Sequence, residues 1–177
     1  MKLVILDRDG TINEDSDAYI KSVAEWRPIA GSLEALARLS QAGYRLVVAT
    51  NQSGIARGLF DTTTLVAIHD TLQRAAAQVG GRIDAFFFCP HAADSSCQCR
   101  KPKPGMLIEI ARRFNVSLAD TYMVGDALRD VEAAAAAGAR PVLVLTGKGK
   151  RTQDEGKLPA GTEVYPDLAA FARKLAP

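Results

Sequence analysis

Short apolar runs alternate along this chain with segments whose apolar residues recur at helical spacing. Five of the runs resemble strands: residues 3–6, 46–49, 85–88, 122–124 and 141–145. Runs that are this short and apolar throughout are typical of strands buried on both faces. Helical segments between such strands imply βαβ units, and hence a parallel sheet with right-handed crossovers. The alternation therefore predicts an α/β fold, a Rossmann-like three-layer sandwich with a central parallel sheet.

Helical spacing is clearest in the longest connecting segment. Asp61 can cap a helix there, and its apolar stripe would consist of Leu65, Ile68, Leu72, Ala75 and Val79. Shorter helices are expected after Gly31, over residues 107–114 and 131–137, and near the end over residues 168–175.

Residues 1–177 are expected to form a single domain. The chain contains no repeat, low-complexity stretch or linker, and its length suffices for one sizeable core. The net charge is only +2 and no run of like charges occurs, so neither nucleic-acid nor membrane binding is favoured. The apolar run at the N-terminus is far too short for a signal-peptide core or a membrane span. We therefore expect a soluble, cytoplasmic protein.

Polar side chains follow four of the predicted strands directly. These side chains are Asp7 and Asp9, Thr50 and Asn51, Cys89 and His91, and Asp126. Ligands of open parallel sheets bind beyond the carboxyl ends of the strands. The sequence therefore predicts that four separate loops converge on one functional rim.

Asp7 and Asp9, two carboxylates separated by one residue, directly follow the first predicted strand and are followed by Gly10. They would repel each other without a nearby cation, and Mg²⁺ prefers such oxygen ligands. One carboxylate could attack phosphorus and form an aspartyl phosphate, while the other serves as the acid and base. Because Asp and Gly are also common in ordinary strand-end turns, this motif alone would not decide the function.

Three further loops carry groups that suit phosphoryl transfer. Asp126 could complete the magnesium site, with Asp130 ordering its loop. Thr50 offers a hydroxyl to a phosphoryl oxygen, and Arg100 and Lys101 supply positive charge. Taken singly, such acids and bases also occur as helix-terminal or solvated surface residues.

In their order and their positions at strand ends, these residues resemble the haloacid dehalogenase (HAD) superfamily of phosphotransferases. The resemblance rests on Asp7-Arg8-Asp9-Gly10-Thr11, Thr50-Asn51, Lys101 and Gly125-Asp126 with Asp130. It implies that Asp7 is the nucleophile and Asp9 the acid/base. It further implies that Thr50 and Lys101 hold the phosphoryl group, and that Asp7, Asp9 and Asp126 bind Mg²⁺.

All three cysteines and one of the two histidines fall within residues 89–99. The four are Cys89, His91, Cys97 and Cys99. Three thiolates and one imidazole form a complete tetrahedral zinc set with no open position, so this loop is predicted to hold a structural Zn²⁺. An odd cysteine count in a chain without a secretion signal does not suit a disulfide framework. Three incidental thiols are the alternative.

The stretches 13–31 and 55–86 are too short to hold the cap domain that many HAD enzymes carry, so a capless enzyme is expected. Nearly the whole chain resembles the D-glycero-D-manno-heptose 1,7-bisphosphate 7-phosphatase family, through residues 50–58, the zinc loop and residues 99–106. The resemblance implies a sugar bisphosphate substrate and a place in nucleotide-activated heptose synthesis for lipopolysaccharide. The candidate substrate-binding residues are Asn51, Gln52 and Ser53 for hydroxyls, and Arg57 and Arg100 for the second phosphate.

The sequence also allows other functions. One alternative is histidinol-phosphate phosphatase, which shares the zinc loop and the catalytic set, or another small sugar-phosphate phosphatase, although segment 53–58 favours the heptose family. A zinc-stabilised binding module without turnover is a further possibility, against which the intact catalytic set argues. Many relatives carry Lys where this chain has Ala127, so either another group makes that contact or the specificity differs. The sequence does not distinguish the α from the β anomer, and a monomer is expected.

Overall fold

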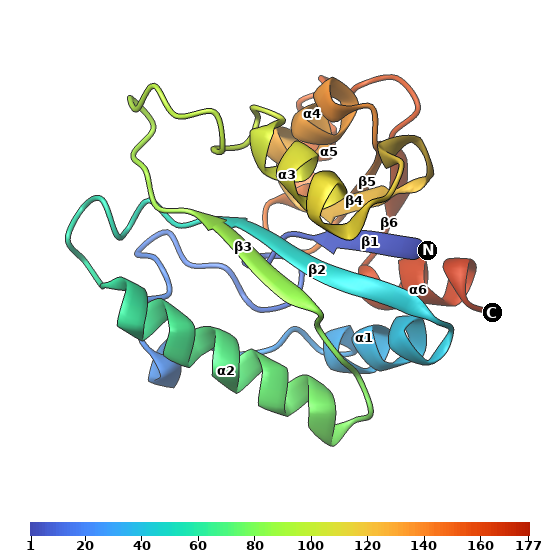
Figure 1. Cartoon of the computed structure of the whole chain (residues 1–177), viewed down its shortest axis with the longest axis horizontal. Helices are drawn as coiled ribbons and strands as arrows, with labels where there is room; N and C mark the ends of the chain where they lie inside the picture. Colours follow the sequence, from blue (N-terminus) through green and yellow to red (C-terminus); the bar gives the residue numbers. More distant parts are fainter.

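The computed structural model covers residues 1–177 and contains one sheet of six strands (Figure 1). The strands are β1 (Lys2–Leu6), β2 (Tyr44–Asn51), β3 (Ala85–Cys89), β4 (Tyr122–Gly125), β5 (Arg140–Val144) and β6 (Glu163–Tyr165). Their order in the sheet is β3-β2-β1-β4-β5-β6, and every neighbouring pair is parallel. The predicted α/β fold with a central parallel sheet is confirmed.

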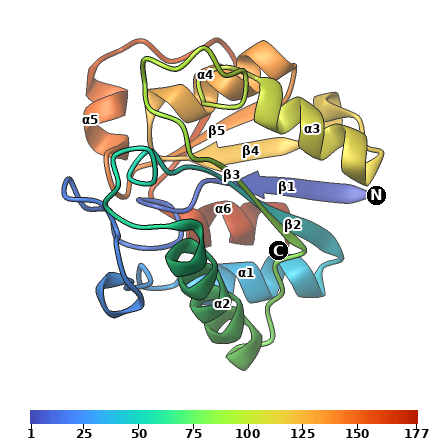
Figure 2. The same cartoon turned by 60° about the vertical axis from the view of Figure 1, so that its left-hand side comes forward.

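Six α-helices flank the sheet. They are α1 (Ser32–Gln41), α2 (Thr62–Gln78), α3 (Gly105–Phe114), α4 (Leu128–Ala137), α5 (Gly149–Asp154) and α6 (Leu168–Leu175), and two short 3₁₀ helices are η1 (Val23–Glu25) and η2 (Leu118–Asp120). Helices α1, α2 and α6 cover one face of the sheet, whereas α3 and α4 cover the other (Figures 1 and 2). None of the helices combines the length and the apolar character that crossing a bilayer requires.

Each face of the sheet buries its own apolar cluster. Leu36, Leu72 and Phe171 pack in the cluster beneath α1, α2 and α6. Leu107 and Ile110 belong to the cluster beneath α3 and α4. Full burial of one such side chain stabilises the fold by about 1.5–3 kcal/mol, so these helix stripes hold the three layers together.

The long helix α2 begins as expected but faces the core differently at its end. The Asp61 side chain accepts a hydrogen bond from the Thr64 amide at 2.8 Å and so caps the helix. In the last turn Ala76 is buried, whereas Val79 is the residue after the helix and is 38% exposed. The predicted stripe is therefore wrong at Val79, because the helix ends one residue before it.

Two elements have no counterpart among the predicted ones. Strand β6 is a half-buried, three-residue edge strand, so it lacks the continuous apolar run of a central strand. Helix α5 has the sequence GKRTQD, which contains no apolar stripe. Periodicity of apolar residues cannot reveal either element.

Strand order places a topological switch at β1, which lies between β2 and β4. From β1 the chain adds β2 and β3 on one side, and then β4, β5 and β6 on the other. The carboxyl ends of β1, β2, β3 and β4 therefore meet along one rim of the sheet. In open α/β sheets a ligand binds at this kind of position.

Candidate active site

Asp7 lies directly after β1 at the centre of the rim. Its main-chain amide donates to the Val124 carbonyl at 2.8 Å, which extends the β1–β4 pairing by one residue. Thr50 is the penultimate residue of β2, and Asp126 directly follows β4. All three side chains are almost completely buried, so the sheet holds them in a fixed arrangement below the surface.

Lys101 reaches this centre from the loop before α3. Its ammonium Nζ lies 3.0 Å from Asp7 Oδ1 and 2.7 Å from Asp130 Oδ1, and it donates to the Ala49 carbonyl at 2.7 Å. Burial alone would lower the pKa of Lys101, but the carboxylates of Asp130 and Asp7 raise it by more. Lys101 therefore remains a cation that is surrounded by oxygen atoms.

Three carboxylates, from Asp7, Asp126 and Asp130, gather around this lysine. Their ligand oxygens all lie within 4.8 Å of one another. Burial and the Asp130 charge raise the pKa of Asp7 to about 6, and burial with the charges of Asp130 and Asp7 raises the pKa of Asp126 to about 8. Lys101, and Arg129 nearby, which contacts none of them, do not balance three ionised carboxylates, so the site favours a further cation.

The cluster fits a hard divalent cation. Asp126 Oδ2 accepts the Lys148 amide at 2.7 Å, but Asp126 Oδ1 is buried without any hydrogen-bond partner. A buried oxygen without a partner is unfavourable unless an ion or water satisfies it. Because every ligand atom here is an oxygen, Mg²⁺ matches the donor set.

The glycine after Asp9 leaves space that Asp126 requires. Gly10 has φ +83°, and a Cβ at this position would collide with the Asp126 carboxylate. On the other side of Asp126, Gly147 has φ +53°, and a Cβ there would also collide with that carboxylate. Both turns therefore need glycine, because their backbones pack directly against a buried acid.

Asp9, the predicted acid/base and magnesium ligand, points its carboxylate away from the three-carboxylate cluster. Arg8 binds it through two hydrogen bonds of 2.9 and 3.1 Å, and Asn13 and Gln52 donate to it at 2.9 and 3.0 Å. Burial would raise the pKa of Asp9, but Arg8 and these hydrogen bonds lower it overall. The Asp9 carboxylate is therefore ionised and lies at the cleft, outside the cluster that could hold the ion.

Arg8 itself is completely buried and reaches His69 on α2. Its Nη1 lies 3.2 Å from His69 Nε2, and the His69 ring stacks on Phe86 with centroids 4.4 Å apart. Burial and the nearby Arg8 charge lower the pKa of His69 to about 3, so its ring is neutral and can accept from the guanidinium. His69 is therefore a buried packing residue behind Asp9.

A cleft of about 210 Å³ opens above Asp9. Its lining includes four of the five predicted substrate-binding residues, namely Asn51, Gln52, Ser53 and Arg100. Arg57 does not line it and instead stacks over the Tyr19 ring, with its Cζ 5.9 Å from the ring centroid. Arg129 and Lys148 line the cleft as well, although neither was among the residues predicted from the sequence. Lys148 follows the fifth strand closely enough for the strand-end rule to have indicated it.

Two amides of the β2 loop are engaged within the protein. Asn51 Nδ2 donates to the Lys101 carbonyl at 3.0 Å, and the Lys101 amide donates to Asn51 Oδ1 at 3.1 Å. Gln52 Nε2 donates to Thr50 Oγ1 at 2.9 Å, in addition to its bond to Asp9. Asn51 thus fixes the backbone that carries Lys101, and Gln52 connects Thr50 with Asp9.

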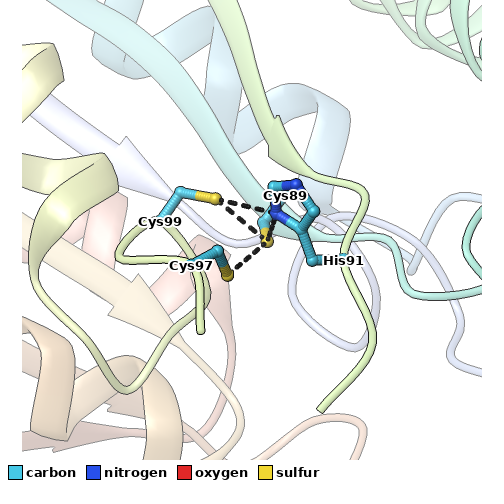
Figure 3. A group of neighbouring side chains, drawn as sticks. All are labelled: Cys89, His91, Cys97 and Cys99. Atoms are coloured by element: carbon cyan, nitrogen blue, oxygen red, sulfur yellow. Dashed lines mark hydrogen bonds between the residues drawn. The ribbon is translucent and has the colours of Figure 1, made fainter. Parts of the chain in front are cut away.

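The cysteine loop forms a compact cluster at the end of β3 (Figure 3). Cys89 Sγ lies 3.8 Å from Cys97 Sγ, 3.2 Å from Cys99 Sγ and 3.4 Å from His91 Nδ1. A tetrahedral Zn²⁺ with ordinary bond lengths would separate two sulfurs by about 3.8 Å, and a sulfur from a nitrogen by about 3.5 Å. The Cys89–Cys97 and Cys89–His91 distances match this geometry, whereas the Cys89–Cys99 distance is about 0.6 Å shorter, so the four predicted ligands are gathered closely enough to hold a zinc ion after a small shift of Cys99.

The chain is similar to several known proteins over most of its length. Residues 98–171 match the HAD-hydrolase-like family. A D-glycero-β-D-manno-heptose-1,7-bisphosphate 7-phosphatase from Bordetella bronchiseptica is 60% identical over 175 residues, covering 99% of this chain and 98% of that protein. The protein of the same name from Pseudomonas putida is 55% identical over 175 residues, covering 99% of both chains. A crystal structure of D,D-heptose 1,7-bisphosphate phosphatase from B. bronchiseptica, complexed with magnesium and phosphate, matches with a TM-score of 0.97 at 60% identity, covering 99% of this chain and 98% of that one.

Proposed function

The chain belongs to the D-glycero-β-D-manno-heptose-1,7-bisphosphate 7-phosphatase family of HAD-like hydrolases, and on this premise we propose that it removes the 7-phosphate of that sugar bisphosphate. Identity of 60% over nearly the whole chain carries this proposal. The reaction would serve the synthesis of nucleotide-activated heptose, a lipopolysaccharide precursor. The relatives' names favour the β anomer, which the sequence alone does not distinguish from the α anomer.

Asp7 is the proposed nucleophile. Its Oδ would attack the phosphorus of the 7-phosphate, the bond from phosphorus to the sugar oxygen would break, and an aspartyl phosphate would form. Water would then attack this phosphorus, releasing inorganic phosphate and restoring the Asp7 carboxylate. The ion pair to Lys101 Nζ at 3.0 Å supports this assignment, because it holds the carboxylate oxygen in one orientation.

Asp9 is the proposed proton donor and acceptor. It would protonate the departing sugar oxygen and later take a proton from the attacking water. Its pKa is lowered in the free protein, chiefly by Arg8 against the effect of burial, which suits the second step. A bound phosphate would add negative charge beside Asp9 and raise its pKa, which favours the protonated form needed for the first step.

Lys101 and Thr50 are proposed to hold the transferring group. The Lys101 charge would offset the negative phosphoryl oxygens, a type of stabilisation that is usually large because the charge is already in place. Its position depends on Asn51, which binds its main chain through two hydrogen bonds. Thr50 Oγ1 is buried next to Gln52 and could donate to a phosphoryl oxygen.

The cluster of Asp7 and Asp126 would hold the proposed Mg²⁺, and Asp130 would keep Lys101 and the Asp126 loop in place. Asp130 Oδ2 accepts the Ala127 amide at 3.0 Å, which fixes the turn that carries Asp126. The main-chain carbonyl of Asp9 accepts no main-chain hydrogen bond, so it is the atom through which Asp9 could bind the ion. When bound, Mg²⁺ would neutralise charge on the phosphoryl oxygens.

The zinc loop is proposed to be structural. With four protein ligands there would be no open position for a substrate. The last ligand, Cys99, lies two residues before Lys101 in the sequence, so the ion would stiffen the segment that delivers Arg100 and Lys101 to the cleft.

The test is a comparison of kcat/KM, in Mg²⁺, for the β and α anomers of the heptose bisphosphate, histidinol phosphate and fructose 1,6-bisphosphate. We expect the β anomer to be the best substrate, by about tenfold or more over each of the others. Equal values for all four would contradict the substrate assignment but not the reaction type. A preference for histidinol phosphate would replace the proposal with the rival activity.

A further inference from the structure

Arg129 is a cleft residue whose guanidinium has no partner. It lies in the first turn of α4 and lines the cleft above Asp9. Its Nε is buried without a hydrogen-bond partner, and the side chain takes part in none of the ion pairs around the site. A partly buried charge without a partner is unfavourable, so a group of opposite charge is expected to join it.

Nearby acids keep Arg129 charged without contacting it. Burial would lower the pKa of Arg129, but the carboxylates of Asp130, Asp7 and Asp126 raise it by more. None of these carboxylates forms an ion pair with it. The N–H donors of the guanidinium therefore remain available, in a planar arrangement that suits phosphate oxygens.

The other basic groups at the cleft differ in how many of their donors already bind protein atoms. Lys101 is bound to Asp7 and Asp130, and Lys148 Nζ lies 3.2 Å from Asp15 Oδ2. Arg100 makes only one long hydrogen bond, of 3.4 Å, to the His91 carbonyl. Arg100 and Arg129 are thus the two cleft cations with donors to spare.

We propose that Arg129, together with Arg100, binds the phosphate that stays on the substrate. This inference rests on the proposed bisphosphatase function, since it needs a substrate with a second phosphate. Lys101 and Thr50 are proposed to bind the phosphate that is transferred. Arg100 and Arg129 are the cations that remain for the second phosphate. Arg129 takes the role predicted from the sequence for Arg57, whose side chain does not line the cleft but stacks over Tyr19, a residue of its wall.

The experiment compares two substrates that differ only in the second phosphate: D-glycero-β-D-manno-heptose 1,7-bisphosphate and the corresponding heptose 7-phosphate. Steady-state kinetics would be measured for the wild type, Arg129→Met, Arg129→Lys and Arg57→Met. Arg74→Met is the matched control, because Arg74 is an exposed arginine on α2 that does not line the cleft. Thermal unfolding would confirm that each variant is folded.

We expect Arg129→Met to lose about tenfold or more of kcat/KM on the bisphosphate, mainly through a higher KM, since a charge-assisted bond is removed. Its loss on the heptose 7-phosphate should be at least about five times smaller, and Arg129→Lys should recover part of the loss on the bisphosphate. Equal losses on both substrates, or no loss on either, would overturn the role of Arg129. A larger loss in Arg57→Met would return the second phosphate to Arg57.

The wild-type arm separates this inference from the proposed function. If kcat/KM of the wild type is no higher for the bisphosphate than for the 7-phosphate, the second phosphate does not contribute to binding. The inference then fails, although the phosphatase activity is retained. A wild type that turns over neither sugar overturns the proposed function and the inference together. Binding of the bisphosphate to Asp7→Asn, measured by calorimetry with and without Arg129→Met, gives the same comparison without turnover.

Discussion

Lys101 Nζ lies 3.0 Å from Asp7 Oδ1, although the two residues are 94 positions apart in the sequence. Both side chains are almost completely inaccessible to solvent. The same ammonium also pairs with Asp130 at 2.7 Å. The proposed nucleophile is thus held by a cation whose charge is shared between two buried carboxylates.

Replacing Lys101 with Met should destabilise the protein strongly. The three carboxylates would then have no ion-pair partner, since Arg129 lies near them but contacts none, and removal of one partner of a buried ion pair typically costs about 3–5 kcal/mol. Urea unfolding in magnesium-free buffer measures this free energy. Adding Asp130→Asn removes one of the acids and should restore part of the stability; a double variant no more stable than Lys101→Met would refute this account of the charge balance.

Asp7→Asn should abolish phosphate release while leaving the protein folded. An amide cannot attack phosphorus as a carboxylate does, so we expect kcat to fall at least about 1,000-fold. Phosphate release from the heptose bisphosphate in Mg²⁺ is the measurement. Asp70→Asn, on the exposed surface of α2, is the matched control and should keep wild-type activity. Activity of Asp7→Asn within tenfold of the wild type would exclude an aspartyl phosphate on Asp7.

The raised pKa of Asp126 predicts a loss of stability between pH 7 and 8.5 when magnesium is absent. Burial, then Asp130 and Asp7, raise this pKa from 3.8 to about 8. In this window the unfolded chain is already ionised, so folding retains a proton; that contribution to stability decreases as the pH rises through about 8.

Thermal unfolding of the wild type and Asp126→Asn, after dialysis into magnesium-free buffer rather than chelator, isolates this contribution. The melting temperature of the wild type should fall by about 3 °C or more relative to the variant across the window. Mg²⁺ should stabilise the wild type more at pH 8.5 than at pH 6, because ion binding displaces the proton. Parallel curves for the two proteins would rule out Asp126 as the responsible group.

The cysteine cluster predicts one zinc ion per chain. Cys97→Ser and Cys99→Ser should each lower the bound zinc, measured by elemental analysis, and reduce the melting temperature, since zinc binding adds to the folding free energy. Ser96→Ala changes an exposed residue of the same loop and should retain the metal. Purified wild type with less than about 0.2 zinc per chain after growth in zinc-containing medium would contradict a structural site.

Much of the fold could be read from local patterns. The five predicted strands are confirmed because each is a short apolar run, and apolar periodicity is a property of neighbouring residues. The same strand ends gave the positions of Asp7, Thr50 and Asp126 on one rim. Strand β6 and helix α5 were not predicted, because an edge strand and a polar helix carry no such pattern.

The site could be predicted only as a set of chemical groups. Sequence alone determined which acids, bases and thiols are available and that the strand ends bring them to one edge. The tertiary structure decided which way they point: Asp9 turns to Arg8, Arg57 lies on Tyr19, and Arg129 faces the cleft. The physical reason is that the positions of the strands along the sequence follow from short-range hydrophobic patterns, whereas side-chain direction follows from packing and charge among segments that are distant in the sequence.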